Sequence, residues 1–291
     1  MLALLAVAAA AALVWRSRSK LTASPTPLRG APLIAPVEPL SAQTKAAVMG
    51  VQSAELVVRT FGGLHLMHGG RDWVQALEQR PVTGFVWQRL LIGAIRDPVV
   101  RPSRDELARQ VSPAYGRETQ LKRMRNVVYH GLPELPAVLK DRILVESQAF
   151  SFRLDGCAVD AVELITAGTA LAGRKTLAPS ETVWAQGVYE QSAGVFLPDF
   201  EKVEDHATDH HPTCTDLVSD VRGLLATKRA DLALVLADTY LASSRSAQAI
   251  AVLEPAFREH PKRKDLADRL GAAYRDAGRD AEAQALAERF A

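Results

Sequence analysis

A segment rich in metal-binding side chains runs from Asp205 to Cys214. It holds three of the seven histidines of the chain, one of its two cysteines and two aspartates. Zinc and other borderline-soft metals take this ligand set, and His206 and His210 would share one face if the segment were helical. Their spacing matches no established zinc pattern, and Pro212 would interrupt a helix. We therefore expect an exposed polar loop. The alternative is a metal site formed by His206, His210 and Cys214.

Other motifs that could carry catalysis are incomplete. Phe61 to Gly70 is rich in glycine, but it lacks the Lys-Ser/Thr pair of a P-loop and the G-x-G-x-x-G order of a dinucleotide site. Flexible turns around a short apolar segment explain it better. The sequence contains no nucleophile elbow and no H-E-x-x-H pattern, and Cys157 and Cys214 are expected to be free, buried thiols. We expect no enzymatic activity, no catalytic residues and no cofactor.

The C-terminal segment repeats one pattern at an interval of 34 residues. Five aligned pairs carry it: Leu236 with Leu270, Ala237 with Gly271, Tyr240 with Tyr274, Ala249 with Ala283, and Leu253 with Ala287. Small residues let the helices of a pair approach closely, and Tyr and Leu fill the space between pairs. A period of this length is typical of stacked antiparallel helix pairs.

This pattern resembles the tetratricopeptide repeat family. Ala256 and Pro261 stand where that family has an alanine and a closing proline, and Gly278 stands at the turn of the second copy. The early Trp of the family is replaced by Ala233 and Ala267. The resemblance covers roughly a fifth of the chain, and it implies an α-solenoid over residues 229–291 that binds a protein partner in a concave groove.

In the family, the first helix of each pair lines the groove. Counted across, the groove residues would be Asp231, Leu234, Val235, Asp238, Leu241, Asp265, Asp268, Arg269, Arg275 and Asp276. We do not expect a chaperone C-terminal tail as partner, because Leu234 and Asp238 stand where the family needs a Lys and Asn clamp. For any single charge in this set, a solvated helix face is the alternative interpretation.

An apolar run from Leu2 to Trp15 is followed by Arg16, Arg18 and Lys20. As a helix it would reach only about 21 Å, against a bilayer core of about 30 Å, so it is a marginal span. Basic residues after the run keep the bulk of the chain on the cytoplasmic side by the positive-inside rule. We expect a single-pass membrane anchor over residues 1–20. A cleaved signal for a periplasmic or secreted protein and an organelle transit peptide are the alternatives.

Between anchor and body, five prolines lie between Ser24 and Ser41. Proline at this density favours an extended, semi-rigid chain, which predicts a spacer over residues 21–43.

The region 44–228 reads as a mostly helical domain of unrecognised type. Ser103 with Glu106 is a capping box that predicts a helix over Asp105 to Val111, and a second helix is predicted over Arg117 to Val128. A third is predicted to begin at Ser180, after Pro179. The fold class is therefore mainly all-α, with a helical body that caps the repeats.

Further apolar patterns in this region are less distinct. Val138 and the run from Ile143 to Val145 read as a stripe on a further helix, as do residues 161–172. Val82 to Val86 and Phe150 to Leu154 have the alternation of short strands.

A net charge of +2 gives no global field that would attract nucleic acid. The basic cluster Lys122, Arg123 and Arg125 reads as a solvated helix face, so we expect no nucleic-acid partner. The function predicted is a membrane-anchored adaptor or scaffold that binds partner proteins, either free or as a constitutive subunit of a larger membrane complex. A metal-dependent enzyme or metal-binding protein is the alternative. Alanine and arginine usage suggests a GC-rich, bacterial genome.

Overall fold

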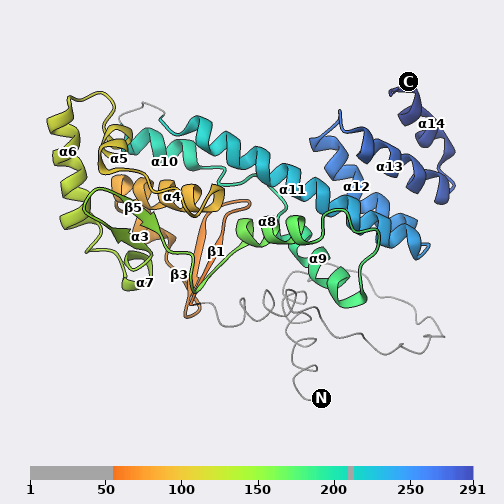
Figure 1. Ribbon diagram of the computed structural model, residues 1–291, viewed down its shortest axis with the longest axis horizontal. Coiled ribbons are helices and arrows are strands. Elements are labelled where there is room, and N and C mark those ends of the chain that lie inside the picture. Colours follow the sequence, from red (N-terminus) through yellow and green to blue (C-terminus); the bar gives the residue numbers. More distant parts are fainter. Residues whose placement is uncertain (1–54, 209–212, 291) are drawn as a thin grey trace, which may run out of the picture. The chain divides into compact units, whose positions relative to one another are not determined.

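The computed structural model describes residues 55–208 and 213–290 (Figure 1), all within one compact unit, Glu38–Ala291. The predicted anchor (residues 1–20) and spacer (residues 21–43) lie outside the described residues. Within the described ranges, the search for a helix of membrane-spanning length and hydrophobicity finds none. The described chain is mainly helical, as expected, but it also contains a small sheet and a separate β-hairpin.

A four-stranded sheet, in the order β3-β2-β1-β6, forms the N-terminal part of the described body. Its strands are β1 (Leu56–Arg59), β2 (His65–His68), β3 (Arg71–Asp72) and β6 (Cys157–Val159). β1 is antiparallel to β2, with Val58 opposite Leu66, and parallel to β6, with Val58 opposite Val159. Strand residues alternate between the two faces, so Leu56, Val58 and Leu66 are all fully buried on one side.

Asp160 ties this sheet to the helix that follows it, α8 (Asp160–Ala170). Its carboxylate accepts hydrogen bonds from the Thr60 backbone N–H at 2.8 Å and from the Thr60 hydroxyl at 2.5 Å. Burial raises the pKa of Asp160, and the hydrogen bonds from Thr60 oppose that shift. The end of β1 and the start of α8 are thereby held together.

The central helix α4 (Pro81–Arg96) is buried from Thr83 to Ile95. Phe85 packs on Phe200 with ring centroids 5.9 Å apart, and Trp87 meets Phe152 edge-on at 4.9 Å. The strand predicted over Val82 to Val86 is therefore wrong. Pro81 at the first helical position starts a helix there, and an apolar run of this length surrounded by other elements buries all faces of that helix.

Two consecutive helices come next, α5 (Arg104–Val111) and α6 (Arg117–Asn126), and α6 continues into a π-helical turn, η1 (Val127–Gly131). The short helix α7 (Ala137–Lys140) follows, and then a hairpin of strands β4 (Ile143–Val145) and β5 (Phe150–Phe152). The predicted cap is confirmed, because the Ser103 hydroxyl accepts a hydrogen bond from the Glu106 N–H at 3.1 Å. The helices predicted over Asp105 to Val111 and Arg117 to Val128 are confirmed in α5 and α6.

The β-hairpin corrects one expectation and confirms another. The apolar stripe predicted as helix over Ile143 to Val145 is strand β4, which pairs antiparallel with β5. The β5 strand lies inside the segment Phe150 to Leu154, which was predicted as a strand. Phe150 is fully buried and Phe152 nearly so, whereas Leu144, on the other face of β4, is exposed. One side of the hairpin therefore packs on the core.

The remaining helices are α3 (Val74–Glu78), α9 (Pro179–Gln191), α10 (Phe200–Ala207), α11 (Thr215–Ala242), α12 (Ser246–Glu259), α13 (Lys264–Asp276) and α14 (Asp280–Glu288). Helices predicted over residues 161–172 and from Ser180 correspond to α8 and α9. α9 begins one residue earlier than predicted, at Pro179.

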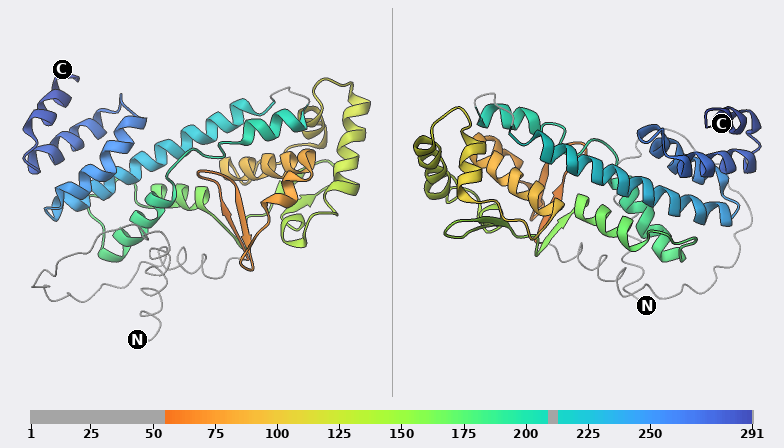
Figure 2. Two further views of the ribbon diagram at one scale, coloured as in Figure 1. Left: turned by 180° about the vertical axis from the view of Figure 1, so that it is seen from behind. Right: turned by 45° about the horizontal axis from the view of Figure 1, so that its top comes forward.

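Helix α11 links the two ends of the described body. It packs on α4, α8 and α9 and also on α12 and α13, and both views of Figure 2 show it running along the body. It passes without interruption through the domain boundary predicted at residues 228/229. Short connections at residues 243–245, 260–263 and 277–279 place α11 to α14 one against the next.

Candidate functional site

The outer face of α6 presents positive charge. Lys122 and Arg125, three residues apart on one helix face, are exposed, and Glu118 lies one turn before them. Tyr129 follows in η1 with 64% of its surface exposed. In Figure 1 and both views of Figure 2, α6 stands at the edge of the body. A cationic helix with an exposed aromatic side chain is therefore open to a partner.

Residues 112–116 join α5 to α6 in a fixed turn. The Gln120 side-chain amide donates hydrogen bonds to the Ser112 carbonyl at 3.1 Å and to the Tyr115 carbonyl at 2.7 Å, and Gln120 is 8% exposed. The guanidinium of Arg123 lies 4.3 Å from the centre of the Tyr115 ring. Gly116, the residue before α6, has nothing within 4 Å of the position that a Cβ would take. This is a helix-turn-helix arrangement in which the turn is held by the second helix.

The β4–β5 hairpin lies beside this helix pair. The backbone N–H of Arg104, at the start of α5, donates to the Gln148 carbonyl in the hairpin turn at 2.9 Å, and Arg101 pairs with Glu146 at 2.6 Å. Residues 101–153 hold ten Lys and Arg against six Asp and Glu, a net charge of +4, although the whole chain carries +2. The small excess of positive charge is therefore concentrated in the segment that contains α5, α6 and the hairpin.

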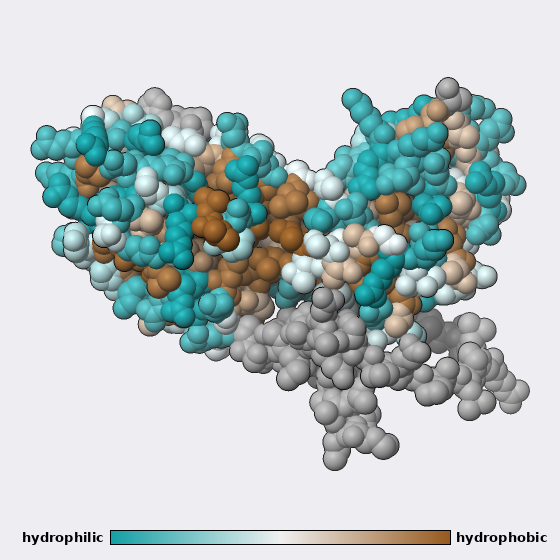
Figure 3. Space-filling view, in the orientation of Figure 1, coloured by the Kyte–Doolittle hydropathy of each residue, from teal (hydrophilic) through white to brown (hydrophobic). Residues whose placement is uncertain are grey.

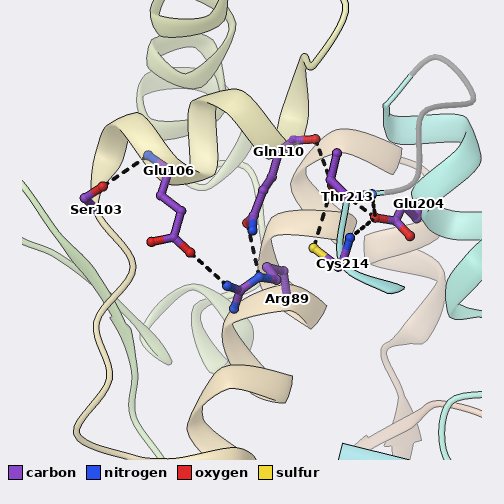
Figure 4. A network of polar contacts seen from close by, with 7 residues as sticks. All are labelled: Arg89, Ser103, Glu106, Gln110, Glu204, Thr213 and Cys214. Carbon is purple, nitrogen blue, oxygen red and sulfur yellow. Dashed lines mark hydrogen bonds and ion pairs between the residues drawn. The ribbon is translucent and has the colours of Figure 1, made fainter. Parts of the chain in front are cut away.

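A polar network fixes α5 against the centre of the fold (Figure 4). Arg89 of α4, only 7% exposed, donates to Gln110 at 3.1 Å and to Glu106 at 3.2 Å, both on α5. The Thr213 hydroxyl donates to the Gln110 carbonyl at 3.3 Å. The network thus connects the helix-turn-helix to the residues that precede α11.

The predicted groove is only partly available to a partner. Val235 is 5% exposed, and Leu234 and Leu241 are half-buried against the core. Asp231 pairs with Arg263 at 2.9 Å and Asp238 pairs with Arg269 at 2.6 Å. The first pair joins α11 to the residue before α13, and the second joins α11 to α13. Asp231, Asp238 and Arg269, which were predicted to face a partner, are therefore paired within the chain.

The helices predicted as the second repeat, α13 and α14, offer more open surface. Asp268, Arg275 and Asp276 are exposed, whereas Asp265 accepts hydrogen bonds from Arg263. Asp268 and Arg275 line a cavity of about 400 Å³ between α13 and α14, together with Gly271. Of the ten predicted groove residues, these exposed α13 charges are the ones best placed to meet a partner.

The metal-site candidates lie in different surroundings. His206 is exposed on α10, and Cys214 is 2% exposed before α11. His210 lies outside the described residues. Burial raises the pKa of the Cys214 thiol to about 11, which disfavours the thiolate that a metal needs. Within the described ranges, no group of three potential metal ligands occurs, and neither Cys157 nor Cys214 forms a disulfide there.

The sequence pattern identified the cations of α6 but not their setting. Lys122, Arg123 and Arg125 were interpreted as a solvated helix face, because nothing in their spacing shows that α5 packs against α6 or that the hairpin contacts the start of α5. The signal that was present is the charge count over residues 101–153, which a whole-chain sum conceals.

No family model matches this chain, and no curated protein matches it either. The tetratricopeptide resemblance therefore stays a prediction. A solved structure, Mycobacterium tuberculosis EmbR in complex with low affinity phosphopeptide, is similar with a TM-score of 0.52 and 20% sequence identity over 81% of this chain. The chain spans only 58% of the length of the EmbR chain. At this identity the likeness concerns the fold alone.

Proposed function

We propose that this chain is a DNA-binding regulator in which α6 enters the major groove. The observation that carries this proposal is the exposed cationic face of α6, the second helix of a helix-turn-helix with a hairpin beside it. The major groove of B-DNA admits an α-helix, and the second helix of such a pair is the one that reads base edges. This proposal departs from the expectation of no nucleic-acid partner, which rested on the net charge of the whole chain.

In this complex, some side chains of α6 and η1 would contact DNA and others would position α6. Lys122 and Arg125 would contact phosphates and base edges, because long cationic side chains are the usual donors to both. Tyr129, exposed at the end of the helix, would pack on the sugar-phosphate backbone. Gln120 and Arg123 hold the turn that sets the angle of α6.

Binding is tested with the full chain in mild detergent and a fluorescent duplex of mixed sequence, about 25 base pairs long, or roughly two helical turns. Anisotropy is measured between about 50 and 200 mM salt, where phosphate contacts weaken strongly. The variant Lys122→Glu with Arg125→Glu is expected to lose affinity and to lower the slope of log K against log salt by about 1.8, which is two phosphate contacts.

The matched control is Lys175→Glu with Lys262→Glu, two exposed lysines outside this region. It makes the same change in net charge. If both double variants weaken binding equally, the effect is one of net charge and the assignment of α6 is wrong. Absence of any binding by the unaltered chain at the lower salt concentration would reject DNA binding itself.

A second proposed function is the recruitment of a protein partner by the tetratricopeptide-like helix pairs α11 to α14. Exposed charges on α13, Asp268 and Arg275, line a cavity beside α14 and favour this proposal. A phosphopeptide is bound in the EmbR structure, whose fold is similar over 58% of that chain, and this is consistent with a protein ligand. With the predicted anchor, this proposal makes the chain a membrane-tethered adaptor.

Protein binding is tested by pull-down from detergent-solubilised membranes. Leu234 and Leu241 are unsuitable for substitution because both pack on the core. Asp268→Lys with Arg275→Glu instead reverses two exposed charges and leaves the net charge unchanged. A defined protein is expected to be lost from this variant but retained by the control Asp216→Lys with Lys175→Glu, two exposed positions outside the repeats. A partner retained by both variants would exclude this surface.

A further inference from the structure

A cavity of about 460 Å³ lies between the β1–β2 turn, the segment from α3 to α4, and α10. Gly62 and Gly63 border it from the turn, and His206 borders it from α10. Figure 3 shows hydrophobic surface gathered between α4 and α8, over β1, on the face seen there. Pockets of this size, with mostly apolar walls and a few polar groups, are typical of small-molecule sites.

The floor of the cavity is formed by apolar side chains that are buried in the core. Leu77 and Leu197 are each 2% exposed and Phe200 is 1% exposed. Val74 and Val203 are half-buried at the walls. A ligand must therefore place an apolar body, such as an aromatic ring, against this floor.

Gln88 supplies a polar group within these walls. It lies in the middle of the buried helix α4, is 6% exposed and lines the cavity. Among residues 55–208 and 213–290, no side chain or backbone group forms a hydrogen bond with its amide. The amide is not among the buried polar atoms of the described chain that lack a partner, so it is accessible from the cavity, where it can donate to or accept from a ligand.

The rim of the cavity carries one carboxylate that is not paired within the described residues. His65 is paired with Asp72 at 2.8 Å, and the rim residue Asp199 is paired with Lys202 at 2.7 Å. Glu78 is exposed at the end of α3 and has no ion pair in the described parts of the chain. It gives the entrance a negative charge that a cationic group can approach.

We propose that this cavity binds a small amphipathic amine. Its ring lies on Leu77, Leu197 and Phe200, a hydrogen-bonding group on the ring meets Gln88, and its ammonium group meets Glu78. This site is separate from the proposed DNA-binding face of α6. Helix α10, which carries Phe200 and Val203 on the cavity side, also carries Glu204, the residue that accepts hydrogen bonds from Thr213 and Cys214.

Tryptamine is the probe, because it combines an indole ring, a ring N–H donor and an ammonium group. 3-Indolepropionate, with the same ring and a carboxylate in place of the ammonium group, is the matched comparison. Binding of each to the folded full chain is measured by ligand-observed NMR titration. Tryptamine is expected to bind more tightly than 3-indolepropionate. Failure of tryptamine to bind at millimolar concentration, or tighter binding of 3-indolepropionate, would overturn the proposal.

Three variants locate the site, and each is first checked for folding by its thermal transition. Gln88→Leu is expected to weaken tryptamine about three- to tenfold through the lost hydrogen bond. Glu78→Gln is expected to weaken it about two- to fivefold, as for an exposed ion pair, and to reduce the preference over 3-indolepropionate. Val203→Trp fills the cavity and is expected to abolish binding.

Glu118→Gln on α6 removes the same charge far from the cavity lining, and it is expected to leave tryptamine binding unchanged. Tryptamine binding that survives in folded Val203→Trp and Gln88→Leu would place the ligand elsewhere and overturn the assignment of this cavity. Because no readout depends on DNA, failure here is distinct from failure of the proposed function.

Discussion

Glu204 holds the start of α11 through its contact with Cys214. Its Oε1 atom lies 2.6 Å from the Cys214 backbone nitrogen and 2.5 Å from that of Thr213, and it also accepts a hydrogen bond from the Thr213 hydroxyl at 3.0 Å. Both nitrogens belong to the residues immediately before α11, which begins at Thr215. One buried carboxylate therefore satisfies donors at the beginning of a helix that reaches the repeats.

Substitution of Glu204 is expected to destabilise the fold. Glu204→Ala removes the acceptor of the Thr213 and Cys214 backbone N–H groups at a site that is 2% exposed, so we expect the free energy of unfolding to fall by about 2–4 kcal/mol. Glu204→Gln keeps an acceptor oxygen but loses the charge, and about 1 kcal/mol is expected. Urea denaturation measures both. Asp205→Ala, its exposed neighbour, is the control, and equal losses for Glu204→Ala and Asp205→Ala would contradict the buried role.

The Cys214 thiol is expected to make stability depend on pH in the alkaline range. Burial raises its pKa to about 11 from an ordinary value of 9.0. Above pH 9 the unfolded chain ionises this thiol while the folded chain keeps the proton. The contribution, at most about 3 kcal/mol, is therefore fully present below pH 9 and is lost as pH rises through about 11.

The measurement is the free energy of unfolding between pH 8 and pH 11, compared with that of Cys214→Ser, whose hydroxyl does not titrate there. The free energy of unfolding of the unaltered chain is expected to fall relative to that of Cys214→Ser as pH rises. Cys157→Ser is a partial control, because burial also raises the pKa of Cys157, which is less buried. A difference that stays constant with pH would show that Cys214 does not titrate differently in the two states.

Local sequence signals predicted elements well where the signal and its cause lie within a few residues. The Ser103 cap of α5 is such a case, because the bond from Glu106 to Ser103 is a contact along the chain. The strand predicted at Val82 to Val86 failed because alternation over five residues says nothing of an apolar run that continues to Ile95.

Contacts between distant segments explain what the sequence could not predict. Val58 pairs with both Leu66 and Val159, and the second partner is about a hundred residues away, so the sheet was not foreseen. Gln88 gives no sequence signal as a cavity residue because only the packing of α10 and the β1–β2 turn creates the cavity. Likewise, the ion pairs of Asp231 and Asp238 depend on where α13 lies.

Helix α8 approaches α11 closely at Gly168, so a side chain there would require Lys228 to shift. A Cβ there would lie 3.0 Å from the Lys228 carbonyl oxygen and 3.1 Å from its Cβ. Gly168→Ala is therefore expected to lower the free energy of unfolding by about 1–3 kcal/mol through overpacking. Thermal or urea unfolding measures the change.

Gly187, in the middle of α9, is the matched helical control. Nothing lies within 4 Å of its Cβ position, so Gly187→Ala is expected to raise the free energy of unfolding by about 0.5–1 kcal/mol, the usual gain in helix propensity. The opposite signs distinguish close packing from propensity. A stabilising Gly168→Ala would mean that α8 and α11 can separate without loss.

The ion pair between Asp238 and Arg269 joins α11 and α13, the first helices of the two predicted repeats. Its atoms lie 2.6 Å apart, and the side chains are 24% and 51% exposed. A half-exposed pair is screened by water, so a double-mutant cycle with Asp238→Ala and Arg269→Ala is expected to give a coupling of about 0.2–1 kcal/mol. Apolar contacts at Leu236 and Leu270, 0% and 2% exposed, should matter more, and Leu236→Ala is expected to lose about 2–5 kcal/mol. Urea unfolding of the unaltered chain, the variants of the cycle and Leu236→Ala compares the ion pair with the apolar contacts. Coupling greater than the loss at Leu236→Ala would mean that charge, and not burial, holds the repeats together.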